Sequence, residues 1–145
     1  MFSSKSIFFT LSLLLFQAEI GEANDTFLCR TNFFKDESLQ IVARKFSVFD
    51  KVYLQCLCGK LPKGKYELTA IWHTPSGQIQ RQEKHSFSLP IVRDYGAFFW
   101  MKLLKKSPFK ETFSNSSFSD KYYGVWTVKL YLNDQSVGSG SFILQ

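Results

Sequence analysis

The chain has 145 residues, 18 of them Lys or Arg and 12 Asp or Glu, and 17% of it is Phe, Trp or Tyr. This aromatic content excludes a disordered tail, and only eight glycines and four prolines exclude a collagen-like repeat. The length fits a single domain.

Residues 1–23 have the pattern of a secretory signal peptide. Lys5 supplies a positive charge, an apolar run extends from Ile7 to Phe16, and small residues precede an expected cleavage before Asn24. The apolar run is too short for a membrane-spanning helix, which needs about 20 residues. We therefore expect residues 24–145 to form an exported domain, secreted or periplasmic, with no stable membrane insertion.

Removal of this leader would make the chain more basic. Without Lys5, Glu19 and Glu22, the 18 basic and 12 acidic residues become 17 and 10, a net charge of +7. One local cluster of lysines stands out: Lys102, Lys105, Lys106 and Lys110. No nucleic-acid-binding motif accompanies it, so we predict no nucleic-acid partner and interpret the cluster as a rim that attracts an acidic protein. The oligomeric state is left open.

Three cysteines are an odd number, so in an oxidising compartment at least one stays free or pairs between chains. Cys56 and Cys58 would point to the same face of a strand, which disfavours a bond between them. We therefore predict a disulfide of Cys29 with either Cys56 or Cys58. A soft-metal site of two thiolates with His73 or His85 is the chemical alternative. One Cys-x-Cys pair is a weak metal signal, so no cofactor is predicted.

Three common catalytic motifs are absent from the sequence. It has no Gly-x-Ser-x-Gly elbow, no phosphate-binding glycine loop and no His-Glu-x-x-His pattern, and His73 and His85 are its only histidines. A small hydrolase with paired carboxylates remains an alternative, because any two of the acids could meet in a fold. We predict no catalytic residue and prefer a protein that is not an enzyme.

The first half of the mature chain is predicted to form strands separated by turns. Residues 33–45 are expected to form a strand rather than a brief helix, and a clearer strand at 52–61 ends at Pro62. Residues 66–73 alternate and are followed by a turn at 75–77. The alternation places on one face Tyr66, Leu68, Ala70 and Trp72.

The second half continues the pattern. Residues 78–89 carry enough charge for an exposed sheet edge, and residues 95–101 are apolar on both faces. A C-terminal hairpin is predicted from 126–132 and 139–144, with a turn at 133–136. Its inward side chains would be Trp126, Val128, Leu130, Leu132, Phe142 and Leu144. The fold class predicted is all-β, an antiparallel β-sandwich in a single domain.

Several of these runs resemble the immunoglobulin-like sandwich domains of small exported bacterial proteins, a family of unknown function. The similarity covers residues 46–145 and is carried by 49–54, by 64–68 leading to Trp72 and its Pro-x-Gly turn, and by 124–128 continuing through Tyr131 to Phe142. It implies an immunoglobulin-like architecture of about seven strands and no particular activity.

The chain departs from antibody-type domains in one respect. No cysteine near Trp126 could bridge to Cys56 or Cys58. The disulfide between sheets is therefore not expected, and Trp72 would pack on apolar side chains instead.

Two segments exceed what a plain sandwich needs. In 95–104, Phe98 and Trp100 lie opposite Phe99 and Met101, and the connection 105–123 is long and rich in aromatics. The connection could cover the strand, because soluble proteins rarely leave large apolar patches bare. We prefer a partner-binding surface, formed by Phe98, Trp100, Lys102, Lys105, Lys106, Phe109 and Phe113.

The predicted function is therefore non-catalytic binding of another protein. A carbohydrate-binding module is the first alternative, and it would need an exposed Trp100 with polar neighbours.

Overall fold

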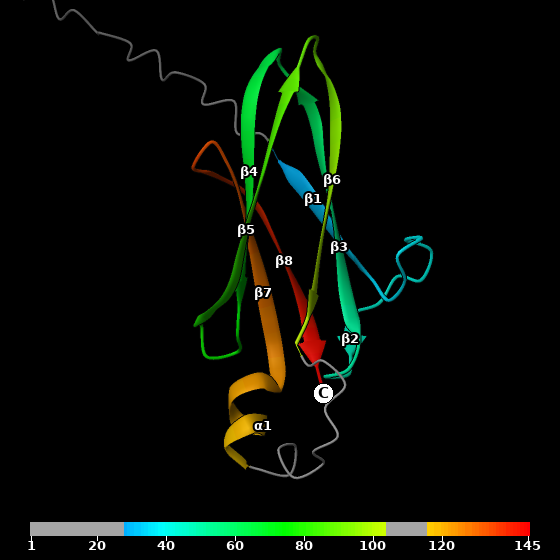
Figure 1. Ribbon diagram of the computed structural model, residues 1–145, viewed down its shortest axis with the longest axis vertical. Coiled ribbons are helices and arrows are strands. Elements are labelled where there is room, and N and C mark those ends of the chain that lie inside the picture. Colours follow the sequence, from blue (N-terminus) through cyan, green and yellow to red (C-terminus); the bar gives the residue numbers. More distant parts are fainter. Residues whose placement is uncertain (1–27, 104–115) are drawn as a thin grey trace, which may run out of the picture.

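The computed structural model describes residues 28–103 and 116–145, which form eight strands and one short helix (Figure 1). The predicted signal peptide 1–23 lies outside the described residues. In chain order the elements are β1 (Cys29–Phe34), β2 (Lys45–Phe46), β3 (Lys51–Leu61), β4 (Gly64–His73), β5 (Ile79–Leu89), β6 (Arg93–Lys102), α1 (Ser116–Tyr122), β7 (Gly124–Leu132) and β8 (Gln135–Leu144).

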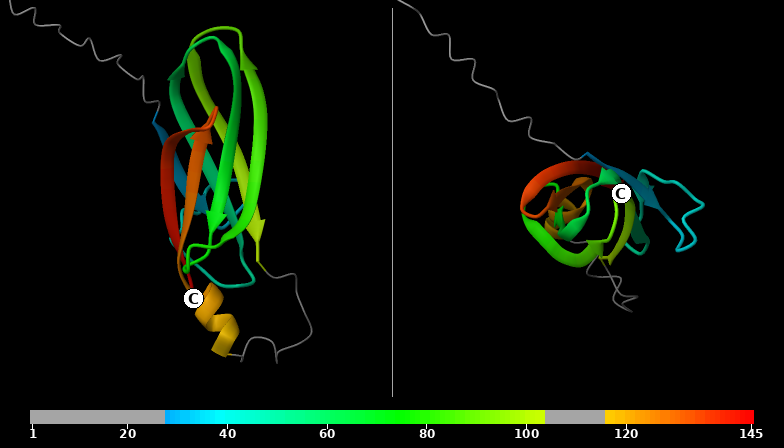
Figure 2. Two further views of the ribbon diagram at one scale, coloured as in Figure 1. Left: turned by 90° about the vertical axis from the view of Figure 1, so that its left-hand side faces the viewer. Right: turned by 90° about the horizontal axis from the view of Figure 1, so that it is seen from above.

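The strands form two sheets. One has the order β1-β3-β6 and the other β2-β8-β7-β4-β5. All pairings are antiparallel except that of the short β2 with β8. Figure 2 shows the two layers facing each other around a common interior. The predicted all-β sandwich is confirmed, with the two-residue β2 raising the number of strands to eight.

The inward side chains of the alternating strands fill the interior, as the sequence predicted. Trp72 from β4 and Trp126 from β7 are fully buried, and the ring of Phe142 from β8 lies 6.1 Å and 5.9 Å from them. Trp126 Nε1 donates a hydrogen bond of 2.7 Å to the carbonyl of Tyr122, so the end of α1 is attached to the core. Trp72 packs on apolar side chains, as expected.

The strand predicted across 33–45 is wrong in its extent. β1 ends at Phe34, and the following residues leave the sheet as a projecting loop (Figure 1, cyan). The carboxylate of Asp36 accepts hydrogen bonds from the backbone N–H of Gln40 at 3.1 Å and of Ile41 at 2.7 Å. This local turn, with Leu39 at a φ of 55°, replaces the ladder of a strand.

The C-terminal hairpin is confirmed, with a tighter turn than the one predicted. Asn133 and Asp134 alone connect β7 and β8, at φ values of 47° and 66°. Two successive residues with positive φ match the right-handed twist of the flanking strands. The side chain of Asn133 also accepts a hydrogen bond of 2.8 Å from the N–H of Glu67, which ties the turn to β4.

One side of the sandwich closes because β8 carries two glycines opposite β1. A β-carbon on Gly138 would overlap the backbone of Cys29, and one on Gly140 would overlap Thr31. Thr31 Oγ1 donates a hydrogen bond of 3.3 Å to the carbonyl of Ser139 between them. The absence of side chains at these positions lets the two sheets meet along this side.

The other side closes through aromatic rings between β5 and β6. Phe87 stacks on Tyr95 with centroids 3.6 Å apart and on Tyr66 of β4 at 5.3 Å. His85 Nε2 forms a hydrogen bond of 2.6 Å with the Tyr95 hydroxyl. β5, which was predicted to be an exposed edge strand, does lie at the edge of the five-stranded sheet. Its side chains, however, contact β6 at the edge of the three-stranded sheet.

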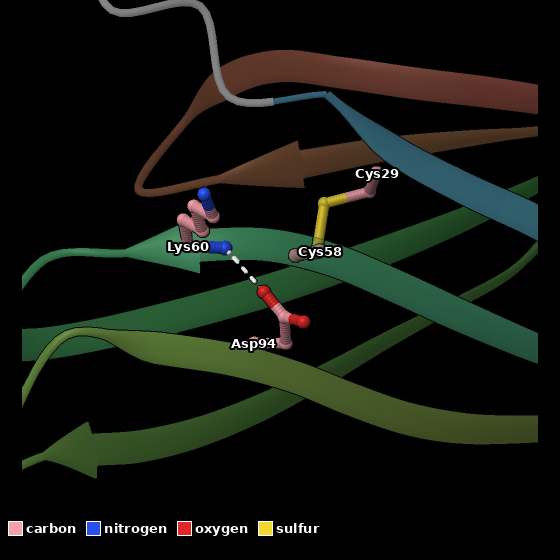
Figure 3. Close-up of a disulfide and its surroundings, with 4 residues drawn as sticks. All are labelled: Cys29, Cys58, Lys60 and Asp94. Atoms are coloured by element: carbon pink, nitrogen blue, oxygen red, sulfur yellow. Dashed lines mark hydrogen bonds between the residues drawn. A yellow bond between two sulfur atoms is a disulfide. The ribbon is translucent and has the colours of Figure 1, made fainter.

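The disulfide joins Cys29 to Cys58, which lie opposite each other on the neighbouring strands β1 and β3 (Figure 3). This settles the choice that the sequence left open, and Cys56 is a free, buried thiol. The bond links two strands of the same sheet. It does not join the two sheets, which agrees with the expectation from the comparison with antibody-type domains.

Candidate functional site

The outer surface of the three-stranded sheet carries large exposed apolar side chains. On β6, Ala97, Phe99 and Met101 face the core, so Phe98 and Trp100 face outward, 62% and 46% exposed. Leu57 on the neighbouring β3 is exposed on the same surface. We call the outward side chains of Leu57, Phe98 and Trp100 the aromatic face.

Cations surround Trp100. The ammonium of Lys51 on β3 lies 4.7 Å from the ring centroid, and the guanidinium of Arg81 on β5 lies 5.4 Å from it. Both distances are within the range of a cation–π interaction. Lys102 is paired with Lys51 in the strand register, so three cationic side chains lie at this end of the aromatic face.

An ion pair accompanies one of these cations. The guanidinium of Arg81 contacts the carboxylate of Glu83 on the same strand. Burial raises the pKa of Glu83, and the positive charge of Arg81 acts in the opposite direction. The pair holds the Arg81 guanidinium beside Trp100, where the Glu83 carboxylate balances its charge.

A groove of about 470 Å³ lies at the other end of the aromatic face. Its lining includes Leu28, Arg30, Leu57, Gly59, Asp94 and Gly96. A β-carbon on Gly96 would come within 3.3 Å of Leu57 Cδ2, so a side chain there would narrow the groove. Asp94 accepts a 2.7 Å hydrogen bond from the N–H of Lys60 (Figure 3), whereas Arg30 has no ion pair within the part of the chain that the structure describes.

The structure does not support the soft-metal alternative in the form that the sequence suggested. Cys58 is bonded to Cys29, so Cys56 and Cys58 cannot both be thiolate ligands. Among residues 28–103 and 116–145, no three His, Cys, Asp or Glu side chains are grouped to hold a metal ion. Burial also raises the pKa of the Cys56 thiol to about 12.

This buried thiol should be unreactive in the folded protein. At pH 8 a pKa near 12 leaves about a thousandfold less thiolate than an ordinary cysteine has, and only the thiolate attacks a disulfide reagent. We expect no reaction with Ellman's reagent under native conditions and one thiol per chain in urea. Rapid native labelling, measured by absorbance, would show that the strand bearing Cys56 opens readily.

The structure brings together only some of the side chains predicted to bind a partner. Phe98, Trp100 and Lys102 lie on one strand at the aromatic face. The other four predicted residues, Lys105, Lys106, Phe109 and Phe113, lie outside the described residues.

Sequence reasoning missed three residues of this surface. Alternation in β3 could have placed Lys51 and Leu57 on one outward face, since the odd-numbered residues there alternate with buried ones. Arg81 gave no signal, because it reaches Trp100 from the other sheet.

No protein-family model matches this chain, and no curated protein matches it. Among solved structures, the chain is similar to part of a β-glucosidase from Listeria innocua in complex with glucose, with a TM-score of 0.50 and 10% identity. The match covers 81% of this chain and 16% of that enzyme. A putative β-galactosidase from Bacteroides fragilis matches with a TM-score of 0.38 and 13% identity, over 77% of this chain and 15% of that one.

The likeness to the β-glucosidase concerns the fold alone. This chain spans less than a fifth of either enzyme's length, and one fold hosts many functions.

Proposed function

We propose that this chain is an exported, non-catalytic immunoglobulin-like module that binds another protein through the aromatic face. The observation that carries the proposal is the outward position of Trp100 and Phe98, side by side on β6. Side chains of this size normally lie in the core, and contiguous exposed patches of them mark interaction surfaces. Trp and Arg are also enriched among the residues that dominate binding energies.

The charges around the aromatic face support an acidic partner. Outward positions of the three-stranded sheet include the cations Arg30, Lys51 and Lys102, and the alternation gives this surface one carboxylate, Asp94, within the described residues. That carboxylate already accepts the N–H of Lys60. Complementary charge at the rim speeds association, and its contribution weakens as salt is added.

The cations beside Trp100 favour a protein over a carbohydrate. A sugar ring would stack on the face of the indole, where the charges of Lys51 and Arg81 already lie within 6 Å of the centroid. A protein carboxylate can instead pair with Lys51, which has no ion pair within the described residues, while apolar side chains pack on Phe98. The exposed Trp100 with polar neighbours meets the requirement of the carbohydrate alternative, so the experiment below includes that ligand.

Export is supported by the signal-peptide pattern and by the disulfide of Cys29 with Cys58, because disulfides persist in oxidising compartments. Within residues 28–103 and 116–145, no helix has the length and apolar character to cross a membrane.

The test is an affinity capture from the exported fraction of the native host with three forms of the protein. One is unchanged, one carries Phe98→Ala/Trp100→Ala, and a control carries Ile79→Ala/Val125→Ala, two exposed aliphatics on the five-stranded sheet. A protein recovered by the first and third forms should bind the aromatic variant at least about thirtyfold more weakly. Equal recovery by all three forms, or retention on polysaccharide lost only with the aromatic variant, would refute the proposal.

A further inference from the structure

Two turns lie side by side at the end of the sandwich opposite the C-terminus (Figure 1). One connects β3 to β4 at residues 61–64, and the other connects β5 to β6 at residues 89–93. The strand registers place them together, because Leu61 pairs with Arg93 and Gly64 pairs with Leu89. We call these two turns the apex.

Contacts beneath the apex hold the two turns as one unit. The hydroxyl of Tyr66 donates a hydrogen bond of 2.6 Å to the carbonyl of Pro62 in the first turn. The ring of the same tyrosine stacks on Phe87, which stacks on Tyr95 at an interplanar angle of 6°. Phe87 precedes the second turn and Tyr95 follows it, so the aromatic stack braces both turns.

The apex exposes aliphatic side chains among positive charges. Ile91 and Val92 are 66% and 62% exposed, between the last residue of β5 and the first of β6. Four exposed cations lie on the two turns and the strand ends beside them: Lys60, Lys63, Lys65 and Arg93. None of the four forms an ion pair within the described residues, and the neighbouring Asp94 is engaged by a backbone N–H.

We propose that the apex docks on an anionic lipid bilayer, with Ile91 and Val92 entering the headgroup region and the four cations contacting lipid phosphates. Apolar side chains beside Lys and Arg are the composition of amphipathic helices that lie on membranes, and the apex presents the same composition on two turns. A protein interface would instead centre on aromatic anchors in a well-packed patch. The residues at the tips of these turns include no aromatic side chain, and the turns lie at one end of the sandwich (Figure 2).

The expected association is reversible. Each Lys or Arg near an anionic surface raises partitioning by about fivefold, and this contribution falls off within a Debye length. Two aliphatic side chains add affinity without anchoring the protein permanently. Docking by the apex would point the long axis away from the bilayer and leave the aromatic face on the side of the molecule, so this proposal is independent of the proposed function.

Vesicle co-sedimentation tests the proposal with protein purified in its exported form. The vesicles are phosphatidylcholine alone, or phosphatidylcholine with about one third phosphatidylglycerol, at low salt. The unchanged protein should bind the anionic vesicles preferentially. Ile91→Ser/Val92→Ser should lower its partition coefficient at least about tenfold, and Lys63→Glu/Arg93→Glu at least about twenty-fivefold. Both pairs are exposed, so the fold should be unchanged by circular dichroism.

The chain offers a matched control in the projecting loop. Ile41 and Val42 are the same two residue types, 57% and 67% exposed, but Asp36 and Glu37 lie in the same loop. Ile41→Ser/Val42→Ser should stay within twofold of the unchanged protein. The proposal is overturned if the unchanged protein does not prefer anionic vesicles, if the apex variants bind as well as it does, or if the loop variant loses as much binding as they do.

Discussion

Gly138→Ala is expected to lower the free energy of unfolding by about 3 kcal/mol, although it adds only one methyl group. The new β-carbon would overlap the carbonyl oxygen of Cys29 on β1 and lie 3.5 Å from the carbonyl carbon. These are backbone atoms, so no rotamer change can remove the overlap. The strand β1 would have to move, and its disulfide to β3 restrains that movement.

The matched control is Gly59→Ala. Gly59 is also a strand residue, but the nearest atom to its added β-carbon is the Asp94 carboxylate oxygen at 3.9 Å. We expect a change within about 0.5 kcal/mol there. Urea unfolding followed by the fluorescence of the buried tryptophans measures both variants. Equal midpoints for the two variants would mean that β1 does not approach β8 this closely.

The effect of Gly138→Ala could not have been predicted from the sequence, for a physical reason. Alternation is a local signal, so the residues of β3 to β8 could be assigned to strands and faces one segment at a time. The contact of Gly138 with Cys29 joins residues far apart in the chain, in strands that share no hydrogen-bonded ladder. No local pattern distinguishes such a glycine from one in an open strand.

The prediction of a strand across 33–45 was wrong for a different reason. Leu39, Ile41 and Val42 have the residue types of a strand, but the carboxylate of Asp36 binds the backbone N–H groups that a neighbouring strand would have used. Local side-chain bonding overrode the apolar pattern.

The two proposed binding surfaces were predictable to different degrees. Phe98 and Trp100 stood out in the sequence because a strand that is apolar on both faces must either be covered or bind something. The cations around Trp100 come from β3 and β5, and the apex combines turns about 30 residues apart in the chain. Only the pairing of the strands brings these groups together.

Removing the disulfide is expected to lower the free energy of unfolding by about 3–4 kcal/mol. The bond closes a loop between residues 29 positions apart, and the lost restriction on the unfolded chain has this size for such a loop. This is a large fraction of the stability of a domain this small. The variant is Cys29→Ala/Cys58→Ala, compared with the unchanged protein in urea with and without dithiothreitol.

Cys56→Ala is the control for this prediction. It keeps the bond and removes one buried thiol, which should lower the free energy of unfolding by about 1 kcal/mol. The reduced unchanged protein should unfold close to the double variant. If the double variant loses no more stability than Cys56→Ala, the bond adds little to the constraint that the sheet already provides.

The two predictions are coupled, and the coupling tests why Gly138 is required. With the bond intact, Cys29 cannot retreat from an added methyl group, because it is bonded to Cys58. Without the bond, β1 is an edge strand paired with β3 alone and can shift. Gly138→Ala should therefore destabilise the Cys29→Ala/Cys58→Ala background by at least about 1 kcal/mol less than it destabilises the unchanged protein. Additive effects in this double-mutant cycle would show that the ladder with β3, rather than the disulfide, fixes the position of β1.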